Sequence, residues 1–324
     1  MKTTNHIPMK TNHALCGLIP GPLLRTLATA LLAVALSFAV PAVARAGLMY
    51  VASGSQSIVK VSSAGVVSPF ATLPASSNPF GVAFDSTGNL FAADSSTGLI
   101  SKITLGGSVS TFVNLGAGSN PLGLTFDISG NLYVAHNGSP SNRTIDKITP
   151  GGAISTFATM APSFNPYSVA FDSSGNLYAG GNNNGANNQI VKISSGGVVS
   201  NFVSSLSGAP ATLAFDSSGN LYTGLGSTIA RITSGGSVST FATTAGNSAP
   251  TGMAFDSNGN LFVADNATGQ ISQITPGGVV SSFATGLDLP RGIAFSSVPE
   301  PGTALFGIAC AGVAALRRRR AAAV

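Results

Sequence analysis

The stretch "PFGVAFDSTGNLFAAD" (residues 79–94) decides the fold, because the chain repeats it. Near-copies read "PLGLTFDISGNLYVAH", "PYSVAFDSSGNLYAGG", "PATLAFDSSGNLYTGL" and "PTGMAFDSNGNLFVAD", and they begin at Pro121, Pro166, Pro210 and Pro250. The Phe before each Asp stands at 84, 126, 171, 215 and 255, so the unit recurs every 40 to 45 residues. A fixed period of this size is typical of proteins built from copies of one small unit.

Each unit predicts four short strands. Its first two are separated by Asp-x-x-Gly-Asn, a tight hairpin in which the Asp side chain caps the turn and Gly takes a positive φ. An Ile-x-Lys-Ile-like piece, a Gly-Gly turn and a Val-Ser-Thr-Phe-Ala-like piece follow. Apolar residues alternate along all four pieces, which favours strands over helices. In the first unit the alternating pairs are Val82/Phe84, Leu90/Ala92, Ile100/Lys102 and Val109/Thr111.

Four strands in about 42 residues is the period of a propeller blade. The chain has no Trp, so it lacks the Trp-Asp of WD40 blades. The repeat resembles the NHL family, whose unit reads Pro-x-Gly-Ile-Ala-x-Asp and then Gly-Asn-Leu-Tyr-Val-Ala-Asp. That resemblance implies an all-β, six-bladed β-propeller of four-stranded blades over residues 47–297.

Two fragments flank the five complete units. Residues 47–71 read as second, third and fourth strands, and residues 290–295 ("PRGIAF") read as a first strand with nothing after it. Together they supply a sixth blade closed by N- and C-terminal strands. A ring shared between both ends in this way leaves no open sheet edge.

The N-terminal segment, residues 1–46, has the pattern of a secretory signal peptide. Basic residues precede the apolar run 26–40, and small residues at Ala44 and Ala46 predict cleavage before Gly47. The alternative is an uncleaved membrane anchor. We therefore expect an exported protein that signal peptidase processes.

The C-terminal segment, residues 298–324, is a second signal. Val298, Pro299, Glu300 and Pro301 precede an apolar run that is short for a permanent membrane span, and four arginines follow: Arg317, Arg318, Arg319 and Arg320. This order resembles the PEP-CTERM sorting signal, which exosortase-type proteases process in Gram-negative bacteria. The resemblance implies transient membrane insertion through a C-terminal helix, then delivery to the periplasm, the outer surface or the extracellular polysaccharide matrix.

Composition excludes several functions. Between Gly47 and Pro299 there are seven Lys or Arg and nine Asp, a net charge of −2, so no nucleic-acid partner is expected. The two cysteines, Cys16 and Cys310, both lie in the terminal segments. The exported body therefore has neither a disulfide nor a thiol nucleophile.

Few residues in the body suggest catalysis. His136 is its only histidine, and five of its nine Asp occupy the hairpin turns. Asp146 is expected to be solvated on a third strand, which leaves Asp94, Asp265 and Asp288. Related propellers include streptogramin lyases and gluconolactonases, and the resemblance implies top-face histidines or a metal held by Glu, Asn and Asp in them. This chain lacks that set. We expect no cofactor, and if a divalent cation binds, Asp94 and His136, with Asp265, are its candidate ligands.

A ligand is expected at the mouth of the channel. The loops before first strands and after second strands vary between blades and share one face. The residues after the unit prolines, which should ring the mouth, are Phe80, Leu122, Tyr167, Ala211, Thr251 and Arg291. With Asp94, His136 and Asp265 they form the candidate top-face site for a polysaccharide or a peptide. Two functions stay open, a non-catalytic exported propeller and a divergent lyase or lactonase. The third-strand cations Lys60, Lys102, Lys147, Lys192 and Arg231 are expected to cover apolar surface with their stems.

Overall fold

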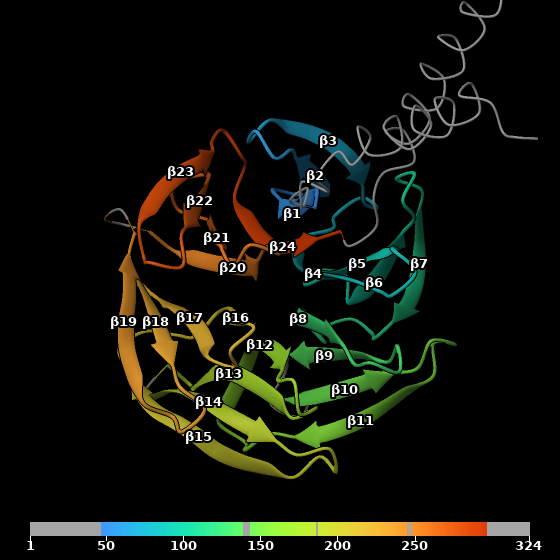
Figure 1. Cartoon of the computed structure of the whole chain (residues 1–324). Coiled ribbons are helices and arrows are strands. Elements are labelled where there is room, and N and C mark those ends of the chain that lie inside the picture. The colour runs from blue at the N-terminus through green and yellow to red at the C-terminus, as the bar shows by residue number, and fades with distance from the viewer. Residues whose placement is uncertain (1–46, 139–142, 186, 245, 247, 297–324) are drawn as a thin grey trace, which may run out of the picture. The chain divides into compact units, whose positions relative to one another are not determined.

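The computed structural model describes residues 47–138, 143–185, 187–244, 246 and 248–296. They form six four-stranded antiparallel sheets arranged as blades around an axis (Figure 1). The five complete repeats give blades 1 to 5. Blade 1 comprises β4 (Pro79–Phe84), β5 (Leu90–Asp94), β6 (Leu99–Ile103) and β7 (Val109–Asn114). Blade 2 comprises β8 (Pro121–Phe126), β9 (Leu132–His136), β10 (Thr144–Ile148) and β11 (Ile154–Thr159).

Blades 3 to 5 repeat this order. Blade 3 comprises β12 (Phe164–Phe171), β13 (Leu177–Asn183), β14 (Asn187–Ile193) and β15 (Val199–Leu206). Blade 4 comprises β16 (Leu213–Phe215), β17 (Leu221–Leu225), β18 (Thr228–Ile232) and β19 (Val238–Thr243). Blade 5 comprises β20 (Pro250–Phe255), β21 (Leu261–Asp265), β22 (Gln270–Ile274) and β23 (Val280–Ala284). The first strand of each blade lies nearest the axis and the fourth lies outermost (Figure 1).

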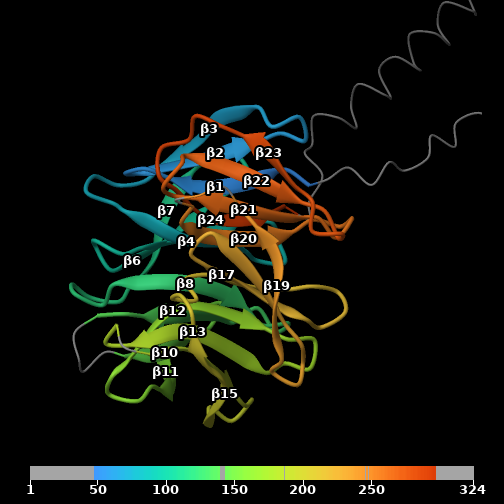
Figure 2. The same ribbon diagram turned by 90° about the vertical axis from the view of Figure 1, so that its left-hand side faces the viewer.

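Blade 6 joins the two ends of the described chain. Its strand order is β24 (Pro290–Phe295), β1 (Met49–Ser53), β2 (Ser57–Val61) and β3 (Val67–Thr72). Met49 pairs with Phe295, and the Ser296 amide donates to the Leu48 carbonyl at 2.9 Å. Figure 2 shows this blade beside blade 5. The predicted split blade is therefore confirmed, and the ring is closed by β pairing.

The Asp-x-x-Gly-Asn hairpins have the predicted chemistry. In the first, Asp85 Oδ1 accepts the Thr87 amide at 2.9 Å and the Asn89 amide at 2.8 Å, and Asn89 Nδ2 donates to Asp85 Oδ2 at 2.9 Å. Gly88 has φ = 86°. Burial alone would raise the pKa of Asp85, but the hydrogen bonds from Asn89 and Thr87 outweigh it and lower that pKa. The carboxylate is ionised and holds the turn.

Aromatic side chains pack between each blade and the next. A second-strand aromatic packs edge-to-face on a Phe of its own fourth strand and on a Phe of the next blade's first strand. Tyr133, for example, lies 4.9 Å from Phe157 and 5.0 Å from Phe171, measured between ring centroids. The pattern recurs at all six interfaces and includes Phe262 against Phe295 of the closing strand, at 5.2 Å. Because every interface buries its own apolar cluster, the core is divided among six seams.

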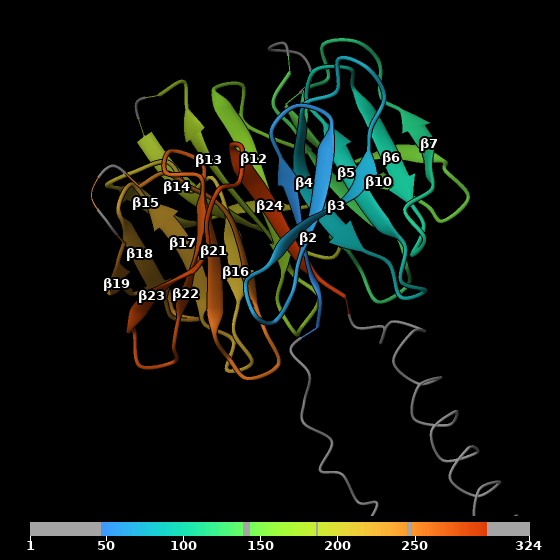
Figure 3. The same cartoon turned by 90° about the horizontal axis from the view of Figure 1, so that it is seen from above.

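The repeated Asp-x-x-Gly-Asn hairpins, the Gly-Gly turns and the described chain ends share one face. Residues of all three kinds line the same cleft: Gly47, then Ser62 and Ser63 between β2 and β3, and Asp256 and Asn258 between β20 and β21. Figure 3 shows the start of β1 and the end of β24 on this side of the ring. We call it the turn face and the opposite side the loop face.

The predicted terminal signals lie outside the described residues. Residues 1–46, with Ala44 and Ala46, and residues 298–324, with Glu300 and the four arginines, are therefore still predictions, as are the terminal apolar helices. Within the described part of the chain, no helix combines the length and the apolar character that a membrane span requires.

Candidate functional site

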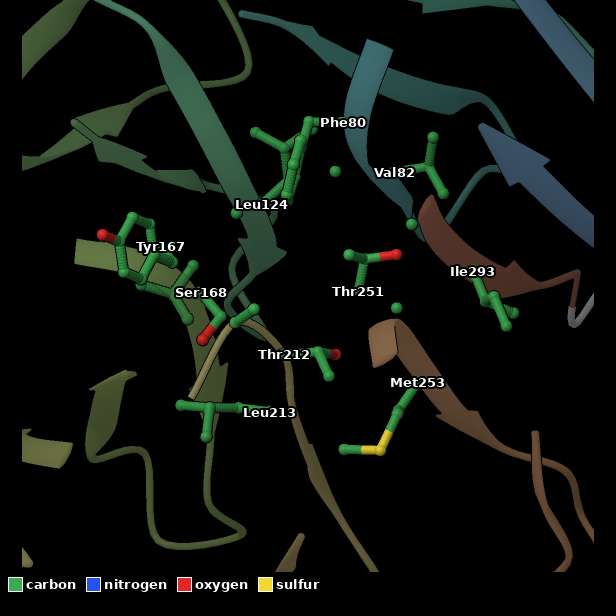
Figure 4. A pocket seen from close by; sticks show the side chains of 16 residues that line it. Phe80, Val82, Leu124, Tyr167, Ser168, Thr212, Leu213, Thr251, Met253 and Ile293 are labelled. Atoms are coloured by element: carbon green, nitrogen blue, oxygen red, sulfur yellow. The ribbon is translucent and has the colours of Figure 1, made fainter. Parts of the chain in front are cut away.

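The six inner strands surround a narrow cavity on the axis (Figure 4). It encloses about 450 Å³ of empty space, including the part open to solvent. The strands approach so closely that a side chain on some of them would clash. A Cβ at Gly252 would lie 1.8 Å from the Arg291 carbonyl oxygen, and one at Gly81 would lie 2.2 Å from that of Leu122. The repeated Gly of the first strand thus keeps the channel narrow.

Four of the six residues predicted to ring the channel mouth line this cavity. Phe80, Tyr167, Ala211 and Thr251 line the cavity. Phe80 and Tyr167 are seen at its edge in Figure 4. Leu122, which is 6% exposed, and Arg291 are not among the residues that line it. The structure therefore brings two aromatic rings from blades 1 and 3 to one opening.

Arg291 is held beside this opening by blade 1. Its guanidinium lies over the Phe80 ring, 5.3 Å from the centroid, and Nη1 donates to Asn78 Oδ1 at 2.5 Å. Burial lowers the pKa of Arg291, and the nearby Asp288 carboxylate opposes that shift. The side chain stays cationic because its ordinary pKa lies far above neutrality. These contacts fix the position of a positive charge at the seam between blades 6 and 1.

A second ring of lining residues lies deeper in the cavity, and the sequence analysis missed it. Its members stand two residues after the predicted mouth positions: Val82, Leu124, Val169, Leu213, Met253 and Ile293. The period of a strand contains the signal, since residues i and i+2 point to the same side. Ser168 and Thr251 add hydroxyls near the axis, but these donate to the carbonyls of Pro210 at 2.9 Å and Pro290 at 3.0 Å. Hydroxyls here tie neighbouring blades together.

Asp94 and Asp265 hold loops in place. Asp94 Oδ1 accepts the amides of Asn78 at 2.8 Å and Ser96 at 3.0 Å, and Thr97 donates its hydroxyl to Oδ2. Asp265 Oδ1 accepts the Ala249 amide at 2.9 Å in the same way. Burial would raise both pKa values, but these hydrogen bonds lower them. Asp94 and Asp265 are at most 2% exposed. Through these hydrogen bonds each connects the loop before a first strand to the loop after a second strand.

His136 has a partner that the sequence analysis did not assign. Its Nε2 lies 3.3 Å from Asp146 Oδ2, and the two side chains are 4% and 16% exposed. The expectation that Asp146 is solvated is therefore wrong. The residue stands where other third strands carry Val, Ser or Ala, for example Val59 and Ala230, and that position faces a blade interface. The departure from the repeat at this position was the available signal.

The candidate cation ligands do not form a set. Among residues 47–296, apart from the gaps noted above, no three His, Cys, Asp or Glu side chains lie close enough to hold a metal ion. Asp94, His136 and Asp265 end the second strands of blades 1, 2 and 5, and each has partners within its own blade. These three candidate ligands therefore do not form one site for a divalent cation.

Known proteins share this fold at low identity. A catalytically inactive variant of virginiamycin B lyase from Staphylococcus aureus, solved with quinupristin, is 21% identical and has a TM-score of 0.55. The similarity covers 67% of this chain and 73% of that one. A nidogen–laminin complex gives 18% identity and a TM-score of 0.65, with 77% and 98% covered. A gluconolactonase from Xanthomonas campestris gives 18% and 0.55, with 65% and 76% covered.

No curated protein matches the chain. The family comparison is more specific than the structural similarity. Residues 138–301 match the model of the virginiamycin B lyase family, and they make up a little more than half of the 324 residues. The matched region begins just after His136 and includes blades 3, 4 and 5 together with the closing strand β24. The chain therefore belongs to the virginiamycin B lyase family.

Proposed function

We propose that this protein is an exported, non-catalytic binding propeller whose ligand site is the channel mouth on the loop face. One observation carries the proposal. Phe80 and Tyr167 line one opening, and the Arg291 guanidinium is fixed over the Phe80 ring. Aromatic rings with a positioned Arg are the side chains that most often anchor a ligand. A sugar or a peptide is the ligand class that suits them.

Placement in the cell is the second part of the proposal. The pattern of residues 1–46 supports cleavage by signal peptidase, and that of residues 298–324 supports processing by an exosortase-type protease after transient membrane insertion. The described chain ends lie on the turn face. That face would thus lie against the membrane before processing, and the loop face would point outward to the surface or polysaccharide matrix.

A binding screen tests the site. The purified protein is screened against glycans and peptides, and any ligand found is titrated with Tyr167→Ala and Arg291→Ala. Each change is expected to weaken binding by about ten-fold or more, the size typical of an anchor residue. Ser86→Ala, in the exposed turn-face hairpin of blade 1, is the matched control and should keep the affinity of the unchanged protein. The proposal is contradicted if every ligand that the screen finds binds normally to both mouth variants.

Membership of the family supports a second candidate, a divergent lyase or lactonase. The proximity of buried His136 to partly buried Asp146 is the observation in its favour, because a His beside a carboxylate can move a proton. His136 is only 3% exposed, however, and no second histidine exists between Gly47 and the C-terminus. Incubating the protein with quinupristin and with a lactone, with and without Mg²⁺, separates the two candidates. Turnover that His136→Ala abolishes would establish the enzyme and refute the non-catalytic proposal.

A further inference from the structure

The turn face carries clefts at equivalent places in the ring. Three are present among the described residues, between blades 2 and 3, blades 3 and 4, and blades 5 and 6. The aromatic triad of one blade interface forms the floor of each cleft. The triads are Tyr133/Phe157/Phe171, Tyr178/Phe202/Phe215 and Phe262/Phe283/Phe295. Turns from the two neighbouring blades form the walls, so one unit of sequence builds the same cleft more than once.

The cleft between blades 2 and 3 is the most spacious of these. It encloses about 880 Å³, open solvent included, against about 580 and 470 Å³ for the other two. Tyr133 is nearly buried at the centre of its floor, and Phe157 and Phe171 are partly exposed on either side. Ile128 stands fully exposed on the rim, at a turn position that carries Ser in the other four hairpins. An apolar floor with an apolar rim favours a ligand that has an apolar face.

The polar groups of this cleft accept and donate hydrogen bonds. Asp127 and Asp172 lie on its two walls, with the serines 129, 173, 174 and 195 around them. Burial would raise the pKa of both carboxylates, but hydrogen bonds from Asn131 and Asn176 lower them, so both are ionised at neutral pH. Lys147 adds an ammonium 5.8 Å from the Tyr133 ring centroid. Lys192 also lies near Asp172 and helps to lower the pKa of that carboxyl, so two ammonium groups balance the two carboxylates and the cleft favours a neutral ligand.

We propose that this cleft binds a neutral sugar residue, with its apolar face on Phe157 and Phe171 and its hydroxyls on the serines and on Asp172. Hydroxyl groups both donate to carboxylates and accept from serines, and a pyranose ring presents an apolar face as well as hydroxyls. Repetition of the cleft around the ring suits a ligand that also repeats, such as a neutral polysaccharide, because several weak sites then act together. This site lies on the face opposite the channel mouth and is independent of it.

Ile128 provides a local probe of the cleft. The purified protein is labelled at its isoleucine methyl groups and titrated with four neutral hexasaccharides, a β-glucan, an α-glucan, a mannan and a xylan, while methyl spectra are recorded. The Ile128 methyl resonance, assigned from an Ile128→Val variant, should shift to saturation with at least one of them. The fully buried Ile271 methyl should not move. Hexagalacturonate, which is anionic, should leave both unchanged.

Matched variants separate binding from folding. Ser195→Trp fills the cleft and should raise the dissociation constant measured from the Ile128 shift about ten-fold or more. A loss of about 1.4 kcal/mol of binding free energy corresponds to that ten-fold change. Leu105→Trp places the same side chain at the equivalent turn position of blade 1, outside the three clefts, and should change nothing. Thermal melting checks that both variants fold.

Two results would overturn the proposal: an Ile128 methyl that responds to none of the four neutral sugars, or one that responds equally in Ser195→Trp. A response to hexagalacturonate alone would overturn the assignment of a neutral ligand. The same titrations with Tyr167→Ala keep the two sites apart. That variant should leave the Ile128 response intact, whether or not the channel mouth binds its own ligand.

Discussion

Removing the last strand should open the ring. Deleting residues 290–324 takes β24 from blade 6 and leaves β1, whose five residues are all buried, without a hydrogen-bonded neighbour on its inner side. Deleting 302–324 alone leaves every described residue in place. The comparison therefore isolates the closing strand from the C-terminal segment that follows it.

The magnitude follows from what β24 buries. Ile293 is 6% exposed, and Phe295 packs on Phe262 in the cluster between blades 5 and 6. A buried side chain of this size contributes about 1.5–3 kcal/mol, so these two contribute about 3–6 kcal/mol. The unpaired backbone of β1 adds to the loss, at about 1–3 kcal/mol for each buried group left without a partner. The sum approaches the whole stability of an ordinary domain, about 5–15 kcal/mol.

Circular dichroism melting of the two purified truncations measures this effect. The 290–324 deletion should lose its cooperative transition or melt at least about 10 °C lower, because each kcal/mol lowers Tm by about 2–4 °C in a domain of this size. Ile293→Ala keeps the strand and should cost about 2–4 kcal/mol, which tests the same contacts in a chain that still folds. Equal melting temperatures for the two truncations would refute the closure argument.

Three further predictions concern the turns and the termini. The Tyr133 hydroxyl donates to Asp127 at 3.3 Å, whereas no such bond joins Tyr178 to Asp172 in the described residues. Tyr133→Phe should therefore lower the free energy of unfolding in urea by about 0.5–1.5 kcal/mol and Tyr178→Phe should hardly change it, and equal losses would contradict this. Acidification should destabilise the ring, because the pKa values of four hairpin carboxyls are lower in the folded state: Asp85, Asp127, Asp172 and Asp216. Their stabilisation is present above the unfolded pKa of about 3.9 and is lost as the pH falls through the folded pKa values. Urea unfolding at a series of acidic pH values measures this loss, and a stability that does not change with pH would contradict it. In the native host, Glu300→Ala or replacement of Arg317 to Arg320 by Ser should leave folding intact but change processing or location; unchanged mature mass and fractionation for both would reject the sorting signal.

The aromatic seams explain several features of the repeat at once. The Phe before each hairpin Asp and the Phe of each fourth strand flank one second-strand aromatic residue. Lys102, Lys147 and Lys192 extend over those rings at 5.4 to 5.8 Å, which supports the expectation that third-strand cations cover apolar surface for these three of the five. One short motif thus supplies the turn, the seam and the floor of the clefts. Substitutions in it should therefore affect stability and turn-face binding together.

The sequence by itself determined the number of blades, their four strands, the hairpin chemistry and the split blade. These features are local or periodic: the Asp-x-x-Gly-Asn turn needs only contacts within five residues, and the leftover fragments 47–71 and 290–295 are complementary in one strand pattern. That Phe80 and Tyr167 line the axial cavity also followed from the pattern, because a single repeat places equivalent residues around one axis.

Only the tertiary structure decided which partners those residues have. Arg291 over Phe80 joins positions more than two hundred residues apart, and the proximity of His136 to Asp146 depends on the register of β9 against β10. The clefts of the turn face exist because turns from two blades leave space above an aromatic triad, and that space depends on the angle and distance between sheets. No spacing along the chain encodes such distances, since they result from the packing of all six seams into a closed ring.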